Sequence, residues 1–190
     1  EICACLVGSE MCIRDSIKIV DATLRDGGLV NNFRFTDEFV KDLYQTNIKA
    51  GVDVMEFGYK ADKEMFDVKD FGKWKFCDDE DIRAVVGDNN TDLKIAVMAD
   101  VGRCNYKQDI KPRAESPVDV IRVATYINQI PAAVDVIEDA VAKGYEVTCN
   151  IMAISNAQEA DIRVALDLLG KSPVNVIYIV AVSYTHLRAH

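Results

Sequence analysis

The chain alternates six short apolar segments with longer segments of helical periodicity, and this alternation limits the folds open to it. The apolar runs are nearly continuous and rich in β-branched residues, which is typical of parallel strands buried on both faces. The predicted strands are Ile17–Ala22, Val52–Phe57, Leu93–Ala99, Val118–Ala124, Glu146–Ile151 and Val174–Val180. A βα series of this kind predicts an α/β fold with helices outside a parallel sheet. A doubly wound open sheet and a (β/α)8 TIM barrel both fit the pattern, and the barrel would be truncated to about six βα units.

Residues that start and end helices bound three of the segments between the strands. The predicted helices are Thr36–Ala50, Pro131–Lys143 and Asn156–Leu169. Thr36 and Asn156 are candidate N-caps, Pro131 suits a first helical turn, and a glycine follows each helix. Trp74 and the acidic run Cys77–Asp81 are interpreted as an exposed insertion that leads into a further helix.

Both ends of the chain differ in character from the remainder. Residues 1–16, the leader, and residues 181–190, the tail, resemble translated sequencing-adapter read-through, so we expect the domain to occupy residues 17–180. A secretion or lipoprotein signal is the alternative for the leader, but Glu1 stands where a positive charge is needed. Both histidines of the chain lie in the tail, so the expected domain contains none.

Composition narrows the class of partner. The chain has 31 acidic and 22 basic residues, and the net charge of −9 argues against a nucleic-acid partner. No run approaches the roughly 20 apolar residues that a membrane-spanning helix needs. Cys77, Cys104 and Cys149 are far apart in the sequence, which is typical of reduced cytoplasmic thiols rather than a disulfide framework. We therefore expect a cytoplasmic domain with no membrane partner.

Charged residues gather where the first three predicted strands end. Arg25 and Asp26 follow the first strand and precede two glycines, which favour a tight turn. Glu56 lies near the end of the second strand, and Asp100 follows the third. Because the carboxyl ends of parallel strands meet on one rim, these side chains are expected to converge, with Glu56 holding the guanidinium of Arg25.

Each of these residues also has a purely structural interpretation. Arg25 and Glu56 would equally serve as an ion pair that only supports the fold. Asp26 would be a turn residue, as aspartate before glycine commonly is. Asp21 and Asp100 would be solvated or helix-capping groups. Position alone does not decide between these interpretations.

Three motifs resemble those of a known superfamily. TLRDGG at 23–28, NNF at 31–33 and MEFG at 55–58 resemble the DRE-TIM metallolyases, which include hydroxymethylglutaryl-CoA lyase, isopropylmalate and homocitrate synthases and 4-hydroxy-2-oxovalerate aldolase. The resemblance is greatest to the bacterial aldolase catalytic domain proteins and covers residues 17–180. It implies a (β/α)8 barrel that makes or breaks a carbon–carbon bond beside a 2-oxo or acyl carbonyl group.

The resemblance also implies roles for particular residues. Asp26 would be a ligand of Mg²⁺ or Mn²⁺, Arg25 would stabilise the enolate oxygen of a pyruvate-like intermediate, and Glu56 would hold Arg25. Further candidates for substrate binding or support of the site are Asp21, Thr23, Asn32 and Asp100. The superfamily's other metal ligands, an H-x-H pair on the seventh strand, have no counterpart in residues 17–180. Leu29 stands where the 4-hydroxy-2-oxovalerate aldolases carry a histidine base.

By this resemblance the parent protein is a metal-dependent lyase or aldolase that acts on a small 2-oxo acid. This chain itself is expected to have little or no activity, because two βα units and two metal ligands are missing. An acyl-CoA condensing synthase, a carboxyltransferase of the same superfamily and a non-catalytic barrel-derived subunit remain open as alternatives. A homodimer is also left open.

Overall fold

A computed structural model describes residues 17–180, so the predicted leader and tail lie outside the described residues. Its centre is one sheet of six strands. The strands are β1 Val20–Asp21, β2 Val54–Tyr59, β3 Lys94–Asp100, β4 Val120–Tyr126, β5 Glu146–Met152 and β6 Val176–Ile179. Every neighbouring pair is parallel.

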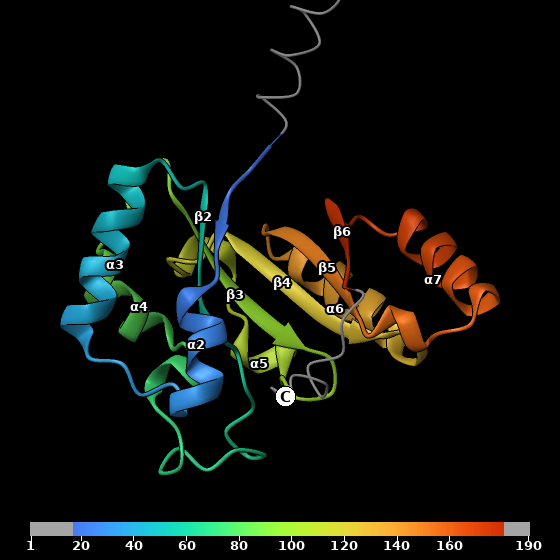
Figure 1. The fold of residues 1–190 in the computed structure, drawn as a ribbon, viewed down its shortest axis with the longest axis horizontal. Coiled ribbons are helices and arrows are strands. Elements are labelled where there is room, and N and C mark those ends of the chain that lie inside the picture. Colours follow the sequence, from blue (N-terminus) through green and yellow to red (C-terminus); the bar gives the residue numbers. More distant parts are fainter. Residues whose placement is uncertain (1–16, 181–190) are drawn as a thin grey trace, which may run out of the picture.

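The order of the strands decides between the two architectures that the sequence left open. The strands follow one another across the sheet in chain order, from β1 to β6. A doubly wound sheet reverses its order at a switch point, whereas a barrel adds each strand beside the previous one. The sheet therefore curls into a half-barrel of the (β/α)8 type, with β1 and β6 at its two edges (Figure 1).

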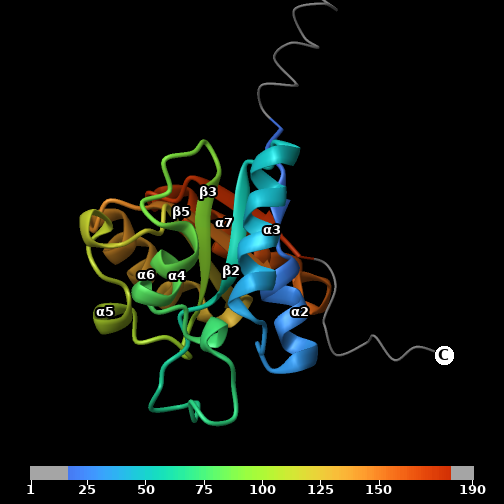
Figure 2. The same cartoon turned by 90° about the vertical axis from the view of Figure 1, so that its left-hand side faces the viewer.

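Helices cover the outer side of the sheet. The α-helices are α2 Thr23–Asn31, α3 Asp37–Ala50, α4 Asp79–Val86, α5 Tyr106–Asp109, α6 Ile130–Ala142 and α7 Glu159–Lys171. Short 3-10 helices are η1 Lys73–Lys75, η2 Arg113–Glu115, η3 Ile127–Gln129 and η4 Ile154–Asn156. α3 runs alongside β2 (Figure 2), and α6 packs against β4 and β5. None of the helices in residues 17–180 is long and apolar enough to cross a membrane.

Several predicted elements are confirmed with their boundary residues. Strands β2 to β6 each overlap the predicted run. The Thr36 hydroxyl accepts a hydrogen bond from the Phe39 amide at 3.2 Å, and Gly51 ends α3 with a left-handed φ of 69°. Pro131 lies in the first turn of α6, where its missing N–H costs nothing.

The first strand is shorter than predicted, and the turn after it was predicted wrongly. β1 has only two residues, and Gly27 and Gly28 lie inside α2 rather than in a tight turn. The helix starts early because the Asp21 carboxylate accepts the Thr23 amide and so satisfies an N-terminal donor. Gly28 serves packing, since a Cβ there would lie 2.1 Å from the ring of Phe33.

The last predicted helix also has different ends. α7 starts at Glu159, because Asn156 lies in η4 and Gln158 occupies the N-cap position with extended backbone. Gly170 remains inside the helix, where nothing would contact an added Cβ, and Ser172 follows as the C-cap.

The interpretation of the 74–81 segment as an exposed insertion is wrong, although the helix start within it is confirmed. Trp74 is fully buried against Phe57, with ring centroids 5.5 Å apart. Its carbonyl oxygen lies where a Cβ on Gly58 would be, at 1.9 Å. The segment is thus part of the core, and its aspartate Asp79 is also buried.

Candidate active site on the inner face of the sheet

The site is centred on Glu56 of β2, whose side chain is completely buried. One carboxylate oxygen, Oε2, accepts hydrogen bonds from Arg25 Nε at 2.9 Å and from Arg122 Nη1 at 2.7 Å. Both arginines are more than nine-tenths buried. Burial of charge is costly unless it is paired, so this carboxylate is needed to hold both guanidinium groups inside the domain.

Arg122 extends the site from β4 towards the later strands. Its Nη2 donates to Asn150 Oδ1 on β5 at 3.2 Å, and its guanidinium lies 5.1 Å from the ring centre of Tyr178 on β6. Asn150 and Tyr178 are register partners across β5 and β6. A guanidinium stacked on an aromatic ring is held in one plane, which presents its donors in a fixed direction.

Three buried polar atoms of this centre have no hydrogen-bond partner among the described residues. They are Glu56 Oε1, Arg122 Nε and Asn150 Nδ2. Buried polar atoms are nearly always paired, with protein or with ordered water. A cavity of about 190 Å³ adjoins them, and its polar lining comes from Arg25, Tyr59, Arg122, Asn150 and Tyr178. The unpaired atoms thus mark a place for water or a polar ligand.

Tyr59 connects this cavity with a second one of about 270 Å³, which is also lined by Leu29, Asp100 and Arg103. Burial raises the pKa of Tyr59 to about 12, against the opposing charge of Arg25. Burial also raises the pKa of Asp100, with Arg103 acting in the opposite direction. Tyr59 therefore keeps its hydroxyl proton at neutral pH and is a hydrogen-bond donor at the junction of the cavities.

Asp26 is adjacent to this centre but differs from it in exposure. Its side chain is half exposed, and its carboxylate pairs with Nη1 of Arg25. Within residues 17–180 no group of three or more histidine, cysteine, aspartate or glutamate side chains is arranged to hold a metal ion. One half-exposed carboxylate does not make a Mg²⁺ or Mn²⁺ site by itself, since these ions take about six ligands in an octahedron. The predicted metal is therefore not accounted for by the described residues.

The remaining sequence candidates divide between the cavities and the surface. Asp100 lines the second cavity. Asp21 binds Thr23 and accepts from Asn47 Nδ2 at 2.9 Å, so it joins the start of α2 to α3. Asn32 ends α2 with a left-handed φ of 54°, and its backbone oxygen accepts from Gly72 at 2.7 Å. Asp21, Thr23 and Asn32 thus stabilise helix ends and line neither cavity.

Sequence reasoning missed Arg122, Asn150, Tyr59 and Tyr178. Two of them had a readable signal, because Arg122 and Asn150 interrupt otherwise apolar strands. A charged or amide side chain in a buried strand needs a partner, and so it points to a polar centre. The two tyrosines gave no comparable signal, because tyrosine is common in strands.

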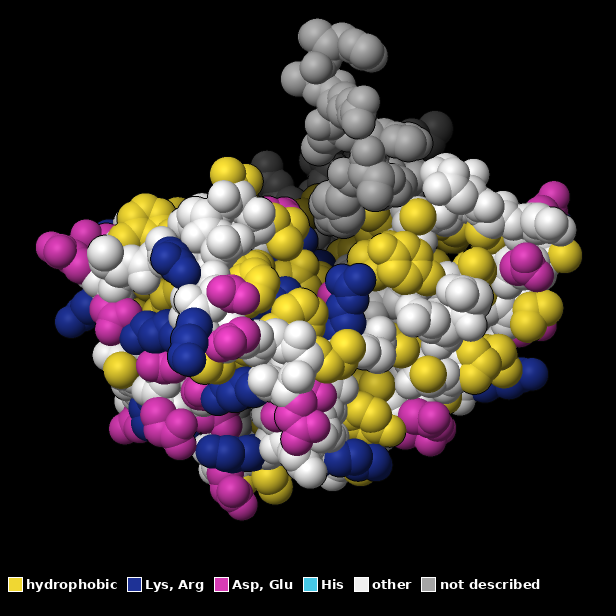
Figure 3. Space-filling view, turned by 90° about the horizontal axis from the view of Figure 1, so that it is seen from below, with side chains coloured by type: hydrophobic (Ala, Val, Ile, Leu, Met, Phe, Trp, Pro, Cys, Tyr) yellow, Lys and Arg dark blue, Asp and Glu magenta, His cyan; other side chains and the backbone are white. Residues whose placement is uncertain are grey.

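The positive charge of the site comes from its buried arginines and not from the surrounding surface. The face seen from below, in Figure 3, carries basic and acidic side chains interspersed with one another rather than an extended basic area. The attraction for an anion must therefore come from the two buried guanidinium groups themselves.

Comparisons with known proteins agree with this geometry. No family model matches the chain. The chain is 28% identical over 144 residues to 4-hydroxy-2-oxovalerate aldolase 6 of Rhodococcus jostii (strain RHA1), a match that covers 76% of this chain and 40% of that protein. The chain therefore spans less than half of the length of this relative.

Two solved structures share the fold of this chain. The N-terminal domain of a candidate aldolase from Bacteroides vulgatus has a TM-score of 0.56 at 21% identity, over 84% of this chain and 62% of that one. The HMG-CoA lyase from Brucella melitensis has a TM-score of 0.54 at 14% identity, over 86% of this chain and 60% of that one. The chain thus spans less than two thirds of the length of each of these three proteins.

Proposed function

We propose that the chain binds a small 2-oxo acid between Arg25 and Arg122, and that the parent enzyme makes or breaks a carbon–carbon bond through the enolate of that acid. The observation that carries the proposal is the sharing of one carboxylate oxygen by two buried guanidinium groups beside a cavity. The similarity to a 4-hydroxy-2-oxovalerate aldolase favours the same class of substrate.

Charge and hydrogen-bond balance favour an anion. Glu56 offsets the charge of only one of the two guanidinium groups in the buried centre, and Asp26 approaches Arg25 from the half-exposed side. A 2-oxo acid carries a carboxylate next to a keto oxygen, and both groups accept hydrogen bonds. The unpaired donors Arg122 Nε and Asn150 Nδ2 match such acceptors.

The proposed reaction moves an electron pair towards these donors. When the bond between the carbon beside the carbonyl group and the hydroxyl-bearing carbon breaks, its electrons form the carbon–carbon double bond of an enolate. The negative charge then grows on the former keto oxygen. Arg25 stabilises that charge, and Glu56 holds Arg25 in position. Tyr59, which keeps its proton, donates a further hydrogen bond at the junction of the cavities.

Cleavage of an aldol also requires a group that takes the hydroxyl proton of the other fragment. Leu29 has no such group, but it lines the same cavity as Asp100. Because burial raises the pKa of Asp100, its carboxylate is a stronger proton acceptor than an exposed aspartate. We assign the base to Asp100 as part of this proposal.

Metal dependence is a separate part of the proposal. Asp26 remains the candidate ligand on the strength of the motif, and a divalent ion bound there would polarise the carbonyl group. None of the steps above is derived from that ion. The expected inactivity of this chain alone likewise stays a prediction.

Exchange of the pyruvate methyl protons with deuterium oxide, followed by NMR, tests the enolate directly. The parent enzyme is expected to catalyse exchange, more strongly with added Mg²⁺ or Mn²⁺, and Arg25→Gln is expected to abolish it. Lys107→Gln is a matched control, because the Lys107 side chain is exposed and its ammonium pairs with Asp139 of α6, away from the candidate site. Exchange that survives Arg25→Gln, or that is absent from the unmodified enzyme, would contradict the proposal.

A further inference from the structure

The short helix η1 carries two lysines, two residues apart, whose surroundings are opposite. Lys73 is partly exposed and forms ion pairs with Asp37 at 2.7 Å and Asp81 at 3.3 Å. Lys75 is more than nine-tenths buried, and its Nζ makes no hydrogen bond or ion pair with any residue in the described part of the chain. A largely buried lysine whose amine has no acceptor among the described residues is unusual, because the ammonium form normally needs one.

Four aromatic rings surround the Lys75 amine instead. Nζ lies 4.5 Å from the ring centre of Phe66, 4.6 Å from Tyr59, 5.2 Å from Phe33 and 5.6 Å from Phe71. These rings come from three parts of the chain: the end of α2, the end of β2 and the 61–72 loop. They attract an ammonium ion, but they do not replace the hydrogen bonds that it loses with its water.

This environment favours the neutral amine, which is the nucleophilic form. Burial lowers the pKa of Lys75; among the charged groups that face it, Asp100 on β3 acts to raise the pKa and Arg103 acts to lower it. At Lys73 burial also acts to lower the pKa, but hydrogen bonds to Asp37 and Asp81 outweigh it and raise the pKa. The two neighbouring amines therefore differ in reactivity for a defined physical reason.

The amine also lies close to space that a small molecule can enter. Tyr59, whose ring contacts Lys75, lines both cavities of the candidate site, and Asp100 and Arg103 line the larger of the two. Lys75 is thus separated from the cavities by one aromatic side chain.

We propose that Lys75 is a covalent site for small carbonyl compounds, with which its amine forms an imine. The nitrogen lone pair attacks the carbonyl carbon and a carbon–nitrogen bond forms. The carbon–oxygen bond then breaks, and the oxygen leaves with both amine protons as one molecule of water. The proposal depends on the surroundings of Lys75 and not on the proposed aldolase chemistry.

Reductive trapping of the full chain with pyruvate and sodium cyanoborohydride tests this site. Peptide mapping by mass spectrometry is expected to find the first adduct on Lys75, at least tenfold in excess over Lys73. In Lys75→Arg, which keeps a cation among the rings, this first adduct is expected to disappear. Lys73→Arg is the matched control and is expected to leave it unchanged.

Two results would overturn the inference. One is an unmodified Lys75 in protein whose exposed lysines, such as Lys107, are modified. The other is equal modification of Lys73 and Lys75. Both results come from the unmodified sequence, so the test does not depend on the folding of a variant. A chain that traps pyruvate on Lys75 but fails to exchange pyruvate protons would retain this inference and lose the proposed function.

Discussion

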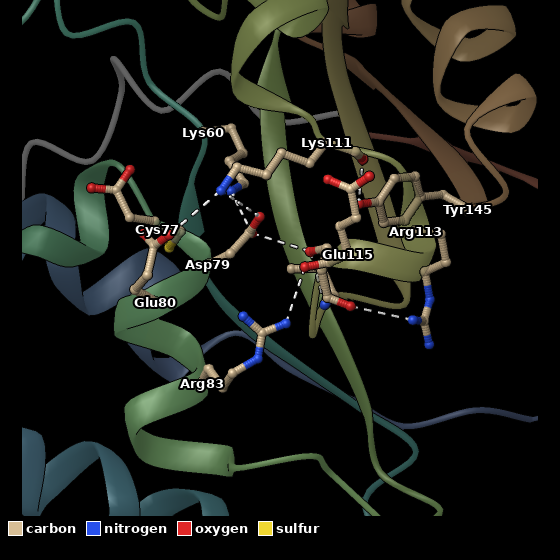
Figure 4. Close-up of polar contacts among 12 residues, drawn as sticks. Lys60, Cys77, Asp79, Glu80, Arg83, Lys111, Arg113, Glu115 and Tyr145 are labelled. Carbon is tan, nitrogen blue, oxygen red and sulfur yellow. Dashed lines mark hydrogen bonds and ion pairs between the residues drawn. The ribbon is translucent and has the colours of Figure 1, made fainter.

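Two buried ionic centres in this domain show how differently paired charge can be used. The first, on the inner face, joins Arg25, Glu56 and Arg122 beside a cavity. The second, on the outer side, is centred on Asp79 at the start of α4. Figure 4 shows the amines of Lys60 and Lys111 next to each other at its carboxylate.

The outer centre is held by contacts among protein groups. Asp79 Oδ1 accepts from Lys60 Nζ at 2.9 Å and from Ser116 Oγ at 3.1 Å, and Oδ2 lies 3.8 Å from Lys111 Nζ. These contacts tie β2, α4 and the segment before β4 together. Asp79 Oδ2 has no hydrogen bond within residues 17–180, but it is an acceptor that faces the ammonium of Lys111. The inner centre instead leaves two buried donors, Arg122 Nε and Asn150 Nδ2, without partners in the described part of the chain, beside a cavity. The comparison teaches that burial of an ion pair does not itself indicate function, whereas unsatisfied donors beside a cavity do.

Replacing Glu56 by glutamine is expected to have the largest effect on the inner centre. Two buried guanidinium groups would then lose their shared counter-charge, so we expect a loss of about 4 to 5 kcal/mol in the free energy of unfolding. Urea unfolding followed by circular dichroism measures this loss. A change below about 1 kcal/mol, the level of an exposed ion pair, would contradict the account.

Asp79→Asn is expected to destabilise the outer centre by about 3 kcal/mol, because Lys60 is left buried without a charge partner. The double variant Lys60→Met, Asp79→Leu removes both charges, and apolar replacements of buried pairs are often neutral. We therefore expect the double variant to recover most of the stability in the same unfolding assay. If the double variant were as unstable as Asp79→Asn, the ion pair would have a role beyond joining β2 to α4.

Arg122→Lys keeps the charge of the inner centre but loses the planar fork that reaches Glu56 and Asn150. About tenfold weaker binding of a 2-oxo acid is expected, which corresponds to about 1.4 kcal/mol. Isothermal titration with pyruvate measures it. Unchanged affinity would place the anion away from Arg122.

Thr36→Ala removes the N-cap of α3, and within residues 17–180 Thr36 forms no hydrogen bond or ion pair with either ionic centre. We expect a loss of about 1 kcal/mol in stability with no change in ligand binding. Differential scanning calorimetry and the same titration check the two parts of this prediction. A loss of binding would mean that α3 shapes the site.

The smallest expected effect is a pH dependence due to Asp100. Burial raises the pKa of this carboxyl group above the ordinary value of 3.8, so the folded state binds the proton more tightly than the unfolded state. Stability from this group is therefore present at low pH and is lost as pH rises through the raised pKa. Asp100→Asn should flatten that part of the stability curve in urea unfolding measured from pH 4 upward. An unchanged curve would contradict the assigned burial effect.

The sequence allowed all six strands to be located, although β1 is shorter than predicted, together with the ends of α3, because apolar runs, Thr36 and Gly51 act locally. Two residues were misjudged. Gly28 is needed because the ring of Phe33 leaves no room for a side chain, and Trp74 is buried because it packs against Phe57 of β2. Those contacts are tertiary, and a local pattern does not contain them.

In the candidate site, too, some contacts could be predicted from the sequence and others depend on the tertiary fold. Arg25 and Glu56 were predicted to meet from strand position, and the structure has them in contact at 2.9 Å. Arg122 joins them from 66 residues beyond Glu56, which only the curling of the sheet brings about. The roles of these residues in catalysis remain predictions.

Titration of the domain with oxalate, a stable analogue of the pyruvate enolate, tests the central claim most directly. We expect binding to the unmodified chain, weaker binding to Arg122→Lys, and unchanged binding to the variant in which Lys60→Met and Asp79→Leu remove the outer ion pair. Absence of binding, or equal affinity for all three proteins, would contradict the assignment of the inner centre as an anion site.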